Sequence, residues 1–104
     1  ETRIVEFVKS EATLSAIPVD TPTDKIRVRH GGYPVQAAAM DPQVVLPLEH
    51  LCSLVADGAI GSLAENAYSF VGATAQGHIK RTYGPTWAQL AKDQGADAVL
   101  LVPI

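Results

Sequence analysis

The chain has 104 residues, enough for one domain, and 47% of them are hydrophobic, so we expect part of its apolar surface to face a partner. A formal net charge of -3 leaves no basic surface for nucleic acid, and no apolar run reaches the roughly 18 residues that cross a bilayer. The single cysteine, Cys52, excludes an internal disulfide framework and a thiolate metal cluster within this chain, and fits a reducing cytoplasm.

The first half of the chain predicts short strands. Residues 4–8 are β-branched and aromatic, and residues 14–17 form a second candidate strand that ends at Pro18. Residues 26–29 alternate apolar and basic side chains, which is typical of a half-exposed strand. The run His30-Gly31-Gly32-Tyr33 then interrupts any regular element.

A helix is predicted after Pro47, because proline at the first turn loses no hydrogen bond. Gly58 is placed to end it as the residue just past the helix. The intervening apolar residues recur at helical spacing and define one face: Leu48, Leu51, Cys52 and Val55. We therefore expect Cys52 to be a buried core residue, and no nucleophile.

The second half predicts an α/β arrangement. Residues 68–71 are a candidate strand stopped by Gly72, and a helix around Trp87 ends at Gly95. Residues 98–104 form a continuous apolar run, as expected of a parallel strand that is covered on both faces. The prediction is a parallel or mixed sheet with flanking helices, Rossmann-like, in which residues 1–104 are an incomplete N-terminal part of one domain. A second chain or a C-terminal part would complete it.

Two loops offer candidate substrate-binding residues. His30, Gly31, Gly32 and Tyr33 combine an imidazole and a phenol with glycines that let a ligand approach the backbone. Ser69, Gly72 and Thr74 lie around a strand end, where hydroxyl and N–H groups can bind a carboxylate or a phosphate. A plain glycine-rich turn and a plain strand end remain the alternatives. The separated histidines have no metal-ligand spacing, so we expect no metal site.

Taken together, six segments resemble the selenoprotein B family of glycine, sarcosine, betaine and D-proline reductases in order and spacing, over roughly residues 16–104. These segments are His30-Gly31-Gly32-Tyr33, Asp41-Pro42, Val45-Leu46-Pro47-Leu48, Gly58-Ala59-Ile60-Gly61-Ser62-Leu63, Tyr68-Ser69-Phe70-Val71-Gly72 and the tail from Gly95 to Ile104. The first fifteen residues match poorly.

The resemblance implies reductive cleavage of a C–N bond α to a carboxylate, with electrons from a thiol system. In the family a redox-active cysteine or selenocysteine follows the last strand, and related subunits carry a pyruvoyl group made by proprotein cleavage. The catalytic group is therefore expected after Ile104, on a partner chain, and this chain alone is expected to bind no cofactor. Either cleavage made Ile104 a terminus, or the sequence is part of a longer chain.

The leading interpretation is thus one chain of a cytoplasmic, hetero-oligomeric reductase that acts on a small amino-acid-type substrate with a thiol reductant. Whether this chain alone is active is left open. One alternative is a lyase or racemase of the same fold acting on a small carboxylic acid. Another is a non-catalytic binding or scaffold subunit.

Overall fold

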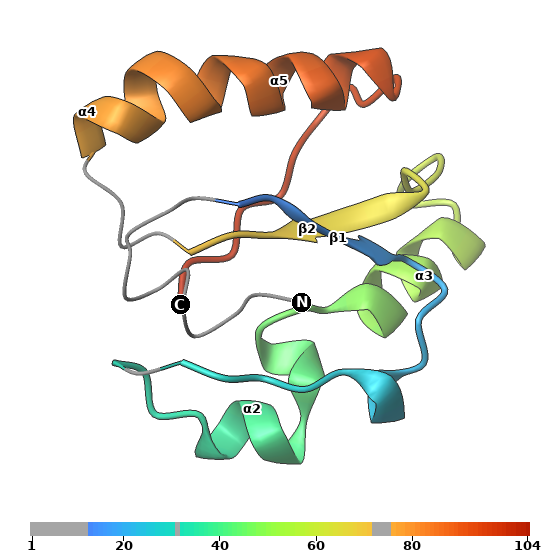
Figure 1. The fold of residues 1–104 in the computed structure, drawn as a ribbon. Coiled ribbons are helices and arrows are strands. Elements are labelled where there is room, and N and C mark those ends of the chain that lie inside the picture. The colour runs from blue at the N-terminus through green and yellow to red at the C-terminus, as the bar shows by residue number, and fades with distance from the viewer. Residues whose placement is uncertain (1–12, 31, 72–75) are drawn as a thin grey trace. The chain divides into compact units, whose positions relative to one another are not determined.

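The computed structural model describes residues 13–30, 32–71 and 76–104, which divide into two compact units (Figure 1). The first unit contains the described residues up to Pro18 together with Ala64–Val99. The second contains Val19–Leu63 and Leu100–Ile104. The strand predicted at residues 4–8 lies outside the described residues.

The first unit contains a two-stranded antiparallel sheet. Strand β1 (Ser15–Pro18) pairs with strand β2 (Asn66–Ser69), with Ser15 opposite Ser69 and Pro18 opposite Asn66. The strand predicted to end at Pro18 is confirmed, and proline is accommodated because it stands at the end of an edge strand. The strand predicted at residues 68–71 is confirmed only in part, since β2 begins at Asn66 and ends at Ser69.

The predicted parallel or mixed Rossmann-like sheet is wrong. Within the described residues the sheet has two antiparallel strands, and residues 98–104 and 26–29 form no strand. The apolar run is exposed, with Val99 64% and Leu101 75% accessible. Apolar and β-branched residues favour extended backbone, but a strand also needs a partner for its N–H and C=O groups. No described segment supplies one to either run.

The rest of the first unit is a continuous helical stretch (Figure 1), made of α4 (Gln76–His78), the π-helical segment η3 (Ile79–Tyr83) and α5 (Gly84–Asp93). The N–H of Gly84 donates to the carbonyl of Ile79 instead of to that of Lys80, its α-helical partner. A Cβ on Gly84 would lie only 3.0 Å from the Ile79 oxygen. Glycine is therefore the residue that lets the wider turn close.

Aromatic side chains connect this helical stretch to the end of β2. The Phe70 ring lies 4.5 Å from that of Trp87, and the Trp87 ring stacks on Tyr83 at 5.5 Å between centroids. The Tyr83 ring in turn lies 5.0 Å from the His78 imidazole. Four rings thus form a continuous series within this unit, although Phe70 remains 39% exposed.

The second unit is built from short helices. These are the 3-10 helices η1 (Thr23–Lys25) and η2 (Pro42–Val44), and the α-helices α2 (Gln36–Met40) and α3 (Leu48–Ala56). Among the described residues of this unit, Ala38 and Leu48 are the buried hydrophobic residues. The apolar face predicted for α3 is correct at Leu48 and wrong at Cys52, which is exposed.

A buried glutamine replaces the missing cap of α3. Pro47 stands at the N-cap position and offers no side-chain acceptor. Instead the side-chain oxygen of Gln43 accepts a hydrogen bond from the backbone N–H of Glu49, and its amide donates to Thr23. The Thr23 hydroxyl donates to the Glu49 carboxylate, which closes a ring of hydrogen bonds. Gln43 is only 7% exposed, so burial of this polar side chain is compensated by its partners.

Both predicted helix ends are confirmed. Gly58 and Gly95 each have φ of 76°, in the left-handed region that glycine adopts without strain. After α3, the N–H groups of Gly58 and Ala59 donate to the carbonyls of Val55 and Leu54, and the end of α5 repeats this pattern. These pairs are the two hydrogen bonds of a Schellman motif.

Candidate functional site

The loop that begins at His30 holds its imidazole in a defined position. The backbone N–H of Gly32 donates to His30 Nδ1 at 3.0 Å. The Tyr33 ring meets the imidazole edge-on, at 6.1 Å between centroids and 78° between planes. Both side chains are half-buried. Because Nδ1 accepts a hydrogen bond, the neutral imidazole carries its proton on Nε2. The loop therefore places an imidazole and a phenol close together.

The glycines of this loop have a smaller part than expected. Gly31 lies outside the described residues. Gly32 is exposed, has no left-handed φ, and a Cβ there would meet His30 Cε1 at 3.7 Å, an ordinary contact. Gly32 therefore does not use the positive φ that glycine permits. The side chains of His30 and Tyr33 therefore give the loop its chemistry.

The second group of predicted residues falls in the other unit. Ser69 is the last residue of β2, lies opposite Ser15, and is half-buried. Gly72 and Thr74 lie outside the described residues. The structure thus brings His30, Gly32 and Tyr33 together in one loop and places Ser69 separately at a strand end.

A surface hollow of about 440 Å³ lies in the same unit as the His30 loop. It is lined by Thr23, Asp24, Ile26, Arg27, Val28, Ala38, Ala39, Met40 and Pro42. The lining combines apolar side chains from the extended segment and α2 with one guanidinium and one carboxylate. Such a mixture, apolar walls with a few polar groups, is characteristic of small-molecule sites.

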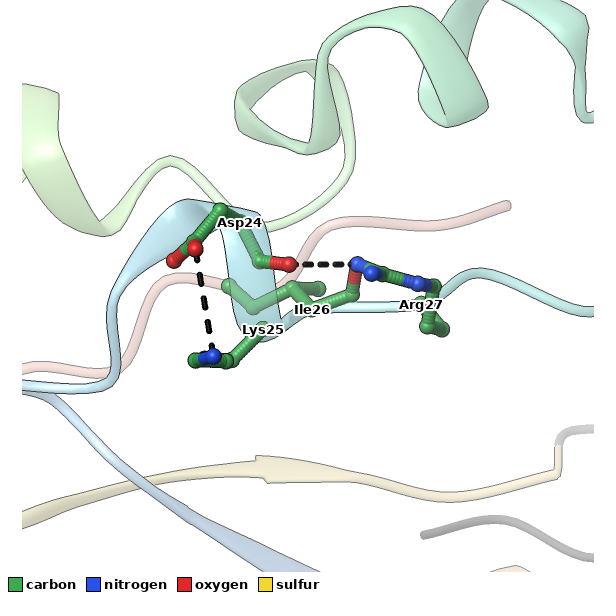
Figure 2. Close-up of polar contacts among 4 residues, drawn as sticks. All are labelled: Asp24, Lys25, Ile26 and Arg27. Carbon is green, nitrogen blue, oxygen red and sulfur yellow. Dashed lines mark hydrogen bonds and ion pairs between the residues drawn. The ribbon is translucent and has the colours of Figure 1, made fainter.

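Figure 2 shows how Arg27 is held at this hollow. Its Nη1 donates to the backbone carbonyls of Asp24, at 2.6 Å, and of Ile26, at 2.9 Å. The Asp24 carboxylate faces the Lys25 ammonium at 4.0 Å, and both side chains are largely exposed. A guanidinium has five N–H donors, so the two hydrogen bonds that Arg27 donates leave others that can bind a carboxylate.

Arg27 and Gln43 are not among the site residues that the sequence predicts. The only sequence signal for Arg27 is the alternation of apolar and basic residues, which predicts a strand. Gln43 follows Asp41-Pro42, and Asp41 caps η2 by accepting from the Gln43 N–H at 3.0 Å. Nothing in that pattern distinguishes a buried glutamine from an exposed one.

The described residues contain no group of three or more His, Cys, Asp or Glu side chains arranged to hold a metal ion. Among the helices in residues 13–30, 32–71 and 76–104, none combines the length and apolar character needed to cross a membrane.

Comparison with known proteins identifies relatives. The family model for glycine/sarcosine/betaine reductase selenoprotein B matches residues 15–103. D-proline reductase subunit gamma of Acetoanaerobium sticklandii is 33% identical over 86 residues, which are 82% of this chain and 36% of that protein. Glycine reductase complex component B subunit gamma of Carboxydothermus hydrogenoformans is 34% identical over 82 residues, 79% of this chain and 19% of that protein. The chain thus spans a minor part of each of these two relatives. No solved structure matches.

Proposed function

The chain belongs to the glycine/sarcosine/betaine reductase selenoprotein B family, and from this we propose that it is one component of a reductase that acts on a small amino-acid-type substrate. The observation that carries the proposal is the match over residues 15–103. It is supported by two relatives whose names are those of reductase subunits, each more than 30% identical to this chain.

The reaction we propose is reductive cleavage of a C–N bond α to a carboxylate. The carbon and the departing nitrogen together take up two electrons and two protons, and a dithiol that supplies them becomes a disulfide. The attacking group would be a cysteine or selenocysteine thiolate or selenolate, or a pyruvoyl carbonyl would serve as electron sink. We assign that group to polypeptide beyond the residues of this chain. Such thiol chemistry is compatible with a reducing cytoplasm.

This chain would contribute substrate orientation. His30 and Tyr33 offer an imidazole and a phenol in one loop, and Arg27 offers a guanidinium at the hollow of the same unit. These groups suit the carboxylate of a small acid, and the apolar lining suits its carbon skeleton. Gly31, Ser69, Gly72 and Thr74 remain weaker candidates for the same task.

We further propose that the enzyme is a hetero-oligomer. Both relatives are named as subunits. Large apolar side chains of the described residues are also exposed, among them Met40 at 88% and Leu100 at 64%. A partner packed against these side chains would remove them from water. This burial stabilises a complex by about 25 cal/mol for each Å² of apolar surface buried.

The test is an activity assay of the assembled enzyme, purified without denaturation from its own cells. Glycine, sarcosine, betaine and D-proline are supplied one at a time with a dithiol. The product measured is the free amine for the first three and the ring-opened amino acid for D-proline, whose nitrogen stays attached through its second carbon. Formation of that product coupled to dithiol oxidation supports the proposal. Turnover of a substrate without dithiol consumption would instead indicate a lyase or racemase. An assembly that turns over none of the four, with or without dithiol, would reject this substrate class.

A further inference from the structure

The helical stretch of the first unit lies in a part of the sequence that has basic residues and no acidic ones. Between Glu65 and Asp93 there is no Asp or Glu, whereas Lys80, Arg81 and Lys92 all occur there. The chain as a whole has a net charge of -3, so this distribution is a local reversal of its charge. Such a segment attracts anions, although attraction alone defines no site.

One cationic group in this segment has a defined place. The Arg81 guanidinium lies over Gly77: a Cβ on that glycine would meet Arg81 Nη2 at 3.3 Å and Cζ at 3.5 Å. The guanidinium can occupy this position closely because glycine has no side chain. The Arg81 side chain is exposed, so solutes can reach its N–H groups.

A second donor on the same stretch is also restrained. The His78 imidazole packs against Tyr83 at 5.0 Å, and Tyr83 stacks on Trp87. His78 ends α4, and Arg81 lies three residues further along, within η3. The π-helical turn that contains Arg81 closes where Gly84 approaches Ile79. π-helical turns inside α-helices recur at functional sites.

From these contacts we propose that Arg81, seated on Gly77, binds a small oxyanion, either a carboxylate or a phosphate, with His78 as a second donor. A guanidinium offers two parallel N–H donors that match two oxygens of such a group, and the imidazole adds a third. Because Gly77 has no side chain, the guanidinium can stay against the helix while it binds the ligand. The proposal rests on contacts within the first unit and is independent of the reductase proposal.

The test uses the protein purified without denaturation from its own cells, with any polypeptide that remains bound to it. NMR follows the Arg81 Nε–H and Gly77 amide signals during titration with sodium acetate and, separately, inorganic phosphate, with sodium chloride keeping the ionic strength constant. We expect saturable shifts at both signals with at least one of the two anions, and the tighter one identifies the ligand chemistry. No saturable shift with either anion would overturn the proposal.

Three variants separate a site from general charge attraction. Arg81→Gln should weaken binding by about tenfold or more, the usual effect of losing hydrogen bonds to a charged group. Gly77→Ala keeps every charge but displaces the guanidinium, so it should also weaken binding. Lys92→Gln, in α5, removes the same charge from the same helical stretch and should leave binding unchanged. If Lys92→Gln weakens binding as much as Arg81→Gln, or if Gly77→Ala has no effect, the proposal is wrong.

Discussion

The side-chain oxygen of Gln43 accepts a hydrogen bond of 3.0 Å from the backbone N–H of Glu49 at the start of α3. This contact joins two helical segments, η2 and α3. The buried side chain of Gln43, in η2, thus caps the N-terminus of α3. The amide of Gln43 is also occupied, since it donates to Thr23 at 2.9 Å.

Gln43→Met should therefore destabilise the chain. Methionine has a similar volume but leaves the Glu49 N–H and the Thr23 hydroxyl without these partners, which costs about 1–3 kcal/mol. Urea unfolding followed by circular dichroism measures the loss. Gln36→Met, at the exposed start of α2, makes the same chemical change and should cost little. Equal losses in the two variants would show that the Gln43 network contributes no stability.

Gly58→Ala should lower the free energy of unfolding by about 1–2 kcal/mol, because alanine is strained at a left-handed backbone position. The φ of Gly58 is 76°, while no neighbouring atom obstructs a Cβ there, so the effect isolates backbone strain. Gly61→Ala is the matched control, since Gly61 has equal space and no left-handed φ. A loss at Gly61 as large as that at Gly58 would contradict the Schellman assignment.

The helix ends could be predicted from the sequence because their causes are local. A glycine after an apolar helical pattern supplies the left-handed residue wherever it occurs, as at Gly58 and Gly95. The strand at Ser15–Pro18 was likewise indicated by local pattern and by its proline. Residues 98–104 were not predictable in this way, because an apolar run does not specify which partner it pairs with.

The candidate site likewise contains residues that local sequence predicts and residues whose place depends on the rest of the structure. The His30–Tyr33 loop could be selected because glycine, imidazole and phenol stand next to one another in the sequence. Arg27 could not be selected, because its position depends on how the carbonyls of η1 are presented to its guanidinium. Cys52 was misplaced because helical spacing defines a face but not how far the buried surface extends around the helix.

Gly84→Ala should destabilise the helical stretch of the first unit. In an ordinary helix interior this substitution stabilises, by roughly 0.5–1 kcal/mol, because alanine has the higher helix propensity. Here the added Cβ would lie 3.0 Å from the Ile79 oxygen and would open the π-helical turn. Thermal unfolding followed by the fluorescence of Trp87, the single tryptophan, measures whether the variant is less or more stable than the original chain. A stabilised variant would show that the turn is an ordinary α-helix.

His30→Ala in the assembled enzyme should lower kcat/KM by about tenfold or more, because it removes a hydrogen bond to a charged substrate group. Stability should change little, since the imidazole is only half-buried. The readouts are amine release and thermal unfolding of the same preparation. His50→Ala, on an exposed position of α3, controls for loss of a histidine elsewhere. Unchanged turnover in His30→Ala would remove this loop from the substrate site.

We propose that this chain is one component of a larger reductase whose catalytic group lies on other polypeptide, and native mass spectrometry of the enzyme purified from its own cells tests this proposal. We expect an assembly heavier than the 11.0 kDa of these residues. It should contain polypeptide that carries a reactive cysteine, a selenocysteine or a pyruvoyl group. A stable species of 11.0 kDa, with no other polypeptide attached, would contradict it.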